Sequence, residues 1–443
     1  MAKNNSAGKN WSTLRLDDII AFNPREIMSK GADAPYIEMA AVPQNGRWHD
    51  EPVIRAVGSG SRFRDGDTLL ARITPCLENG KTAQVRGLGH GVVGWGSTEF
   101  IVMRAKPETA DPDFVYLLAR NPGFREYAIQ QMTGTSGRQR VPAESIAAFE
   151  VTLPPLFEQR KIASILGALD DKIELNRRMN TTLEAMARTL FQSWFVDFDP
   201  VHAKAEGRQP VGMDAETAAL FPDSFEDSAL GPIPQGWEVV TLGNVLTELE
   251  TGRRPKGGVA SFASGIPSVG AESINGIGVF DYAKTRYVPE EFYERNTSGR
   301  IRDFDVLLYK DGGKPGEFRP RVGMYGLGFP FVKFSINEHV FRMRTERLGQ
   351  AFLYFLVSSH RVLEDFANKG GKAAIPGINQ PDVKSTLLVH PSKQLLERYN
   401  DLSLQFCERI LRYASESQSL SEVRDNLLPQ LLSGELRVGD VAG

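Results

Sequence analysis

Apolar side chains recur at alternating steps of four and three through the middle of the chain. The positions in this stripe are Ile162, Leu166, Leu169, Ile173, Asn176, Asn180, Leu183, Ala187, Leu190 and Trp194. The period predicts a long helix from about Leu156 to Phe195, with the stripe as the seam of a coiled coil. An amphipathic helix lying on a globular core would carry a wider stripe and would not explain the two asparagines.

A second stripe of the same kind begins near Ser392. Its positions are Leu395, Tyr399, Leu402, Phe406, Ile410, Tyr413, Ser417, Leu420, Arg424, Leu427 and Leu431. Two successive steps of four form a stutter, which locally relaxes a supercoil. Gly434 follows the stripe, and glycine is a common residue at the end of a helix. We therefore predict a second long helix that ends near Gly434.

The two helices are expected to pair in antiparallel orientation. A helix of about 40 residues is ~60 Å long, whereas the ~41-residue connection after it spans only ~35 Å as a flexible coil. The second globular part should therefore begin near the far end of the first helix. In the expected register Asn176 faces Ser417 and Asn180 faces Tyr413. Because buried asparagine disfavours slipped alignments, we expect these four residues to fix the register and the length of the rod.

The chain contains an internal repeat of long period. Such a repeat indicates that one structural unit occurs more than once in the fold. The matched segments, in chain order, are WSTLRLDDII with WEVVTLGNVL, RFRDGDTLLAR with RIRDFDVLLYK, STEFIVMR with NEHVFRMR, FVYLLARNPGFREYA with FLYFLVSSHRVLEDFA, and VTLPPLFEQR with LLVHPSKQLLER. Order and spacing are kept while side chains diverge. One fold is therefore expected to occur twice, with different surface chemistry on each copy.

Short apolar runs among glycine and proline predict mixed strands and short helices in each copy. The fold class is α+β: two tandem globular domains separated by an antiparallel two-helix coiled coil, as a pseudo-twofold dumbbell. The expected boundaries are 1–154 for the first domain, 155–196 for the first long helix, 197–236 for a mostly irregular linker, 237–390 for the second domain, 391–434 for the second long helix and 435–443 for a tail.

Composition excludes several classes of protein. The net charge of −3 and the charged fraction of 24% do not fit a protein that coats nucleic acid by bulk charge, although local basic patches stay possible. Two distant cysteines, Cys76 and Cys407, exclude a disulfide framework and a cysteine zinc site. No membrane-spanning stretch or signal peptide is recognised, so a cytoplasmic location is expected.

Catalytic and cofactor motifs are missing from the sequence. NGKT at Asn79–Thr82 lacks the earlier glycine of a phosphate loop, and GHGVVG at Gly89–Gly94 is followed by a strand-like segment where a dinucleotide site needs a helix. The histidines are scattered and no metal-ligand pattern occurs. We expect no catalytic residue, no metal and no cofactor in this chain.

The sequence resembles a known family. VTLPPLFEQRKIASILGALDDKIELNRRMNTTLEAMARTLFQSWFVDFDP is similar to the central conserved region of type I restriction–modification specificity subunits, and HPSKQLLERYNDLS with LLPQLLSGELRV is similar to the distal one. GDTLLARITPCLENGKTA, STEFIVMRA, TGRRPKGG, IPSVGAESI and IPGINQPDV resemble motifs of the family's recognition domains. The resemblance implies a non-catalytic DNA-binding subunit whose two target-recognition domains each read half of a bipartite, asymmetric site.

The resemblance also implies partners that supply the chemistry. Two modification subunits, which bind S-adenosylmethionine and methylate adenine at N6, would dock on the conserved helices. Restriction subunits would add ATP- and Mg-dependent translocation and cleavage. Alternatives are the recognition subunit of another modification system, an unrecognised DNA methyltransferase or nuclease, and a coiled-coil scaffold with no role on DNA.

Arg, Lys, Asn and Gln read base edges, and basic or glycine-bearing loops contact phosphates. The candidate DNA-binding residues of the first copy are Arg72, Asn79, Lys81, Arg138, Gln139 and Arg140. Those of the second copy are Arg253, Arg254, Lys256, Lys310, Lys314 and Lys372. Both copies place a glycine-rich basic segment just before VP or IP, so we expect the two segments to serve the same purpose.

Overall fold

The computed structural model describes residues 11–135, 137–314, 316–371 and 376–441. The chain forms two compact units, Met1–Leu175 with Ser417–Gly443 and Asn176–Glu416. The long helices α5 (Leu156–Phe195) and α13 (Lys393–Ser433) each contribute one segment to each unit. The first unit is therefore discontinuous in sequence.

The first unit contains a four-stranded antiparallel sheet in the order β2-β9-β6-β7 and a second four-stranded sheet in the order β4-β3-β8-β5. The strands are β1 (Ser12–Arg15), β2 (Ile20–Phe22), β3 (Asp33–Ile37), β4 (Val53–Ala56), β5 (Ser61–Phe63), β6 (Thr68–Ala71), β7 (Thr82–Gln84), β8 (Gly94–Gly96), β9 (Phe100–Ala105) and β10 (Glu150–Leu153). The short helices are α1 (Leu16–Ile19), η1 (Met39–Ala41), α2 (Pro112–Arg120), α3 (Pro122–Gln130), α4 (Ala143–Ala147) and α14 (Val438–Val441).

The second unit contains a five-stranded sheet in the order β14-β21-β18-β19-β16 and a three-stranded sheet in the order β17-β15-β20. The strands are β13 (Glu238–Thr241), β14 (Glu248–Thr251), β15 (Ile266–Val269), β16 (Gly276–Ile277), β17 (Arg286–Val288), β18 (Asp305–Tyr309), β19 (Val322–Tyr325), β20 (Ser335–Ile336), β21 (Val340–Arg344) and β22 (Leu387–His390). The helices are α8 (Leu242–Val245), η2 (Ala271–Ser273), η3 (Tyr282–Lys284), α9 (Glu290–Arg295), α10 (Gln350–Val357), α11 (His360–Gly370) and α12 (Gln380–Lys384).

The two units repeat one strand topology. β1 pairs with β10 as β13 pairs with β22, and the β2-β9-β6-β7 order recurs as β14-β21-β18-β19. A parallel pair also recurs, as β3 with β8 and as β15 with β20. Even a turn is shared, since Asp67 accepts from the Arg64 amide at 2.8 Å and Asp305 accepts from the Arg302 amide at 2.7 Å. The repeat in the sequence is therefore a repeat of the fold.

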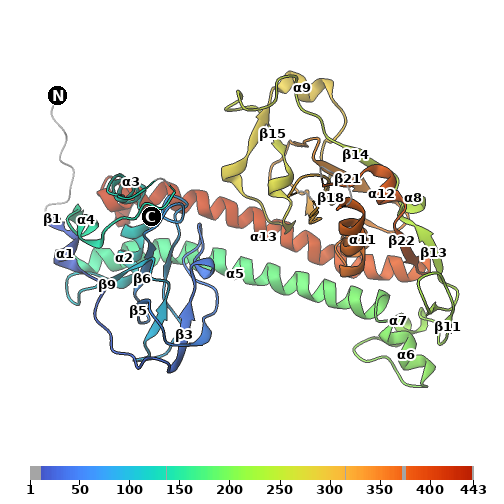
Figure 1. Ribbon diagram of the computed structural model, residues 1–443, viewed down its shortest axis with the longest axis horizontal. Coiled ribbons are helices and arrows are strands. Elements are labelled where there is room, and N and C mark those ends of the chain that lie inside the picture. The colour runs from blue at the N-terminus through green and yellow to red at the C-terminus, as the bar shows by residue number, and fades with distance from the viewer. Residues whose placement is uncertain (1–10, 136, 315, 372–375, 442–443) are drawn as a thin grey trace. The chain divides into compact units, whose positions relative to one another are not determined.

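Each unit buries one helix almost completely. α2 lies beside β6 and β9 (Figure 1) and also packs against β7. Its residues from Phe114 to Ala119 are buried. α10 packs against β18 and β19, and all of its residues from Ala351 to Val357 are buried. This burial accounts for the continuous apolar runs at these two places, where a one-sided helix would alternate apolar and polar faces.

The long helices complete both cores. In the first unit, Ile162 and Leu166 belong to one buried cluster with Leu428 and Leu431. In the second unit, the Trp194 and Tyr399 rings lie 6.1 Å apart, and the Tyr399 hydroxyl donates to the Ala187 carbonyl at 3.1 Å. Asn176 donates to Glu416 at 2.9 Å. Because 176 meets 416 while 187 meets 399, α5 and α13 run in opposite directions within this unit.

The segment expected to be a mostly irregular linker is partly folded. It contains α6 (Asp199–Ala205), α7 (Ala215–Ala219) and the hairpin strands β11 (Phe225–Glu226) and β12 (Ile233–Pro234). Val201, Phe221 and Ile233 are buried in the core of the second unit. The acidic and proline-rich composition suggested irregular chain, but these isolated apolar residues are enough to tie the segment down. No helix of the described residues is both long and apolar enough to cross a bilayer.

Candidate nucleic-acid interface

In the first copy, the structure brings together two segments that the sequence analysis selected separately. Thr74 donates its amide to the Gln139 carbonyl at 3.0 Å, and Val141 donates to the Arg72 carbonyl at 2.9 Å. Residues 72–74 and 139–141 therefore lie side by side. Arg72, Gln139 and Arg140 share one region, and Asn79 and Lys81 lie on the loop that leaves it.

The second copy builds the same arrangement. Ile378 donates to the Lys310 carbonyl at 2.8 Å, and Gly312 donates to the Pro376 carbonyl at 2.9 Å. Lys310 occupies the position of Arg72, since Lys310 donates its amide to the His339 carbonyl at 2.9 Å and Arg72 donates to Glu99 at 3.0 Å. Of the predicted residues of this copy, Lys372 lies outside the described residues.

The first-copy candidates differ in how they are held. Arg140 is exposed, and its guanidinium forms a salt bridge with the Glu99 carboxylate, with 2.7 Å between Nη2 of Arg140 and Oε1 of Glu99. This hydrogen bond raises the pKa of Arg140, so the side chain stays charged. Lys81 donates to the Met39 carbonyl at 2.7 Å, which gives it an internal role in the loop. Arg138 and Asn79 are exposed, and Arg72 and Gln139 are half-buried.

The second-copy candidates divide in the same way. Lys310 pairs with Asp311 at 2.9 Å, and Arg254 lies 2.7 Å from Glu338. Asp311 also accepts a hydrogen bond from the His339 ring. Arg253, Lys256 and Lys314 are exposed. Each copy thus combines cations oriented by a carboxylate with exposed cations, an arrangement suited to a polyanionic ligand.

Sequence reasoning missed the ion pairs that brace both sheets. Arg104 bonds Asp67 at 2.7 Å and Glu26 at 2.7 Å, and Arg344 bonds Asp305 at 2.6 Å at the matching place in the second copy. The identity of Arg and Asp at equivalent positions of the repeat, where most side chains diverge, was the signal that could have found them.

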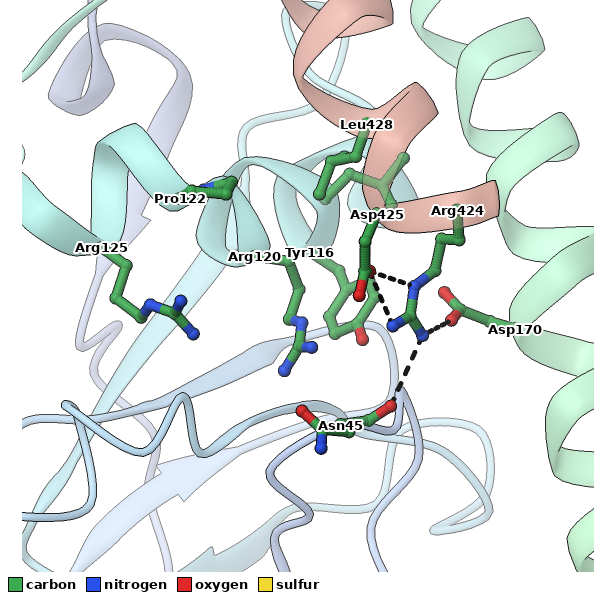
Figure 2. Close-up of a pocket in the computed structure, with 10 residues that line it drawn as sticks. Asn45, Tyr116, Arg120, Pro122, Arg125, Asp170, Arg424, Asp425 and Leu428 are labelled. Carbon is green, nitrogen blue, oxygen red and sulfur yellow. Dashed lines mark hydrogen bonds and ion pairs between the residues drawn. The ribbon is translucent and has the colours of Figure 1, made fainter. Parts of the chain in front are cut away.

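A third ionic cluster lies within the first unit, between α2, α5 and α13 (Figure 2). Arg424 bonds Asp170 at 2.7 Å, with both side chains buried, and also contacts Asp425. The cluster lines a cavity of about 170 Å³, together with Arg120 and Arg125. Arg424 also donates to the Asn45 carbonyl at 3.4 Å, which ties the cluster to the loop between η1 and β4 (Figure 2). The cluster fastens both long helices to the first copy.

Two observations concern metal ligands and reactive thiols among the described residues. In the described parts of the chain, no three His, Cys, Asp or Glu side chains gather in a way that could hold a metal ion. Burial raises the pKa of the Cys407 thiol to about 12, which keeps it protonated and unreactive.

Comparison with known proteins identifies relatives of this chain. Residues 8–185 match the family model described as "Type I restriction modification DNA specificity domain". The chain is 26% identical to the HindI specificity subunit of Haemophilus influenzae, over 84% of this chain and 87% of that one. It is 23% identical to the MjaIX specificity subunit of Methanocaldococcus jannaschii, over 74% of this chain and 70% of that one.

A solved structure shares the fold of the chain. The crystal structure of the type I restriction–modification S subunit from M. genitalium aligns over 97% of both chains, with a TM-score of 0.53 at 13% identity. The likeness in fold extends over nearly the whole length of both chains. Residues 8–185 of the chain therefore resemble a type I restriction modification DNA specificity domain, and most of the chain is similar to type I restriction enzyme specificity subunits.

Proposed function

We propose that this chain is the DNA-binding specificity subunit of a type I restriction–modification complex and that each copy of the repeat reads one half of a bipartite, asymmetric site. One observation carries the proposal. Both units pair the same two segments of the fold, residues 72–74 with 139–141 and 310–312 with 376–378, and the side chains differ: Arg72 and Arg140 lie in the first pair and Lys310 in the second. Equal geometry with unequal chemistry suits two different half-sites.

The proposal includes a rod that sets the distance between the half-sites. Antiparallel contacts of α5 and α13 inside the second unit, together with the heptad stripe, support an antiparallel coiled coil in a dumbbell-shaped molecule. A fixed separation of two readers gives a fixed gap in the target, as half-site spacing does in dimeric readers.

Partner subunits would supply catalysis. Two modification subunits docked on α5 and α13 would bind S-adenosylmethionine and methylate adenine at N6, and restriction subunits would use ATP and Mg. This chain would hold no cofactor itself and would act in the cytoplasm, where its DNA target lies.

Mapping methylated adenines in cells with and without this chain tests the proposal. We expect methylation at one bipartite motif with a fixed gap, lost when the chain is deleted. In the full complex, Arg138→Ala with Arg140→Ala should abolish methylation at that motif while complex assembly persists. An unchanged methylation map after deletion would contradict the proposal. S-adenosylmethionine bound by the isolated chain would favour a methyltransferase instead.

A further inference from the structure

An open cleft of about 420 Å³ lies in the first unit beside the candidate interface. It is formed by the chain after β2, by β5, and by the chain before β9. Three arginines line it, Arg25, Arg62 and Arg72, together with Ser61 and Thr98. Arg72 is the one member that sequence reasoning had selected, so the cleft extends the interface in a direction that the sequence did not indicate.

The charge inside the cleft is positive. Glu26 also lines it, but this carboxylate accepts from Arg64 at 2.6 Å and from Arg104 at 2.7 Å. Burial opposes ionisation of Glu26, yet the two hydrogen bonds outweigh burial and lower its pKa, so Glu26 stays charged and compensated. The three lining arginines are therefore not neutralised by it.

Two of these arginines have bonding capacity left. Within the described parts of the chain, no ion pair or side-chain hydrogen bond engages Arg25, which is exposed. The Nε of Arg72 is buried and lacks a hydrogen-bond partner among the described residues. Arg62 donates one nitrogen to the Glu26 carbonyl at 2.7 Å, which orients its guanidinium. Such a set of donors suits an oxyanion.

We propose that this cleft seats a phosphate of the DNA backbone and thereby positions the first copy on its half-site. The proposal rests on the proposed function and deepens it. Guanidinium and hydroxyl groups around a concave surface match a protruding phosphate better than a flat base edge. The cleft borders the base-reading candidates, because the Arg72 amide bonds the Glu99 carbonyl at 3.0 Å and Glu99 holds Arg140.

In the second copy, the arginine that matches Arg62 has another role. Arg300, at the position of Arg62, donates to the carbonyls of Tyr293 at 2.6 Å and Asn296 at 2.9 Å and so binds the end of α9. The backbone contact inferred here therefore belongs to the first copy.

Arg25→Ala in the complete complex tests the inference, with Arg15→Ala as the matched control. Arg15 is likewise exposed, in the same unit, but does not line the cleft. Binding is measured over a salt series to a duplex carrying the mapped motif and to a duplex with that motif scrambled. We expect Arg25→Ala to weaken binding to both duplexes equally, by roughly three- to tenfold, and to reduce the salt slope by about one. Arg25→Lys should keep the wild-type slope.

Unchanged binding by Arg25→Ala would overturn the inference. A loss confined to the motif duplex would also overturn it, because that result describes a base contact. An equal loss from Arg15→Ala would show a bulk-charge effect and would overturn it as well. A wild-type complex that does not distinguish the two duplexes would contradict the proposed function itself, which is a separate failure.

Discussion

The buried pair Asp170–Arg424 shows how single residues hold the long helices to the first unit. The two side chains are 2% and 5% exposed and lie 2.7 Å apart, and Arg424 also pairs at 2.7 Å with the exposed Asp425. Burial raises the pKa of Asp170, while Arg424 opposes that shift. A buried pair of this kind tolerates joint replacement better than loss of one member, because a lone buried charge stays uncompensated.

Arg424→Met should therefore destabilise the first unit by roughly 3–5 kcal/mol, and adding Asp170→Leu should recover most of the loss. Denaturant unfolding of both variants measures the difference. Arg412→Met is the control, since Arg412 lies on the same helix in an exposed pair with Glu408. If the double variant were as unstable as the single one, the pair would not be the cause.

His49 predicts a pH dependence of stability. Its Nδ1 lies 2.6 Å from the Asp50 carbonyl and its Nε2 accepts from the Arg86 amide, so the buried ring is neutral. Burial lowers its pKa below the usual 6.5. Well above pH 6.5, His49 is unprotonated in both the folded and the unfolded chain. As pH falls below 6.5, the unfolded chain binds the proton more readily than the folded chain, so the free energy of unfolding decreases.

We expect His49 to remove up to about 1.4 kcal/mol per pH unit from the unfolding free energy below pH ~6.5. His49→Gln should reduce that slope, whereas replacing the exposed His360 in the same way should not. Denaturant unfolding at pH 7.5, 6.5 and 5.5 provides the measurement. Equal slopes in wild type and His49→Gln would refute the assignment.

At the scale of elements, the spacing of apolar residues predicted the local structure and missed contacts between segments far apart in the sequence. The four-three spacing located α5 and α13 to within a few residues, because a helical seam is a local period. The pairing of residues 72–74 with 139–141 joins segments far apart in the sequence, so no periodic pattern of side chains predicts it. The same holds for the linker core, where Phe221 and Ile233 meet strands that lie much later. Arg25 and Arg62 were missed because the segments that form the cleft are far apart in the sequence.

Asn176 and Asn180 lead to a prediction about the pairing of α5 and α13. Asn176 is buried and bonds Glu416, whereas Oδ1 of Asn180 is buried without a hydrogen-bond partner in the described chain. Their expected pairing with Ser417 and Tyr413 stays a prediction. Replacing both asparagines with leucine should raise stability by about 1–2 kcal/mol, because a buried unsatisfied group is removed. It should also broaden the gap in the methylated motif. An unchanged gap would exclude a role in register.

At the scale of the whole molecule, the two units have separate cores. One core comes from a continuous stretch of the sequence and the other does not. The core of the second unit is drawn entirely from residues between 176 and 416. The core of the first unit needs Leu428, Leu431 and Leu432, from the far end of the chain. The first unit is therefore completed after nearly all of the chain has been made, although its strands come first.

Deleting residues 417–443 should unfold the first unit and spare the second. Each buried leucine stabilises by about 1.5–3 kcal/mol, so losing three is comparable with the ~5–15 kcal/mol that holds a domain together. In hydrogen exchange of the truncated chain, amides of β6 and β9 should exchange rapidly while those of β18 and β21 stay protected. Deleting only 435–443, which leaves α13 intact, is the control and should preserve both sets. Persistent protection of β6 and β9 after the longer deletion would mean that the first unit does not depend on α13 for its fold.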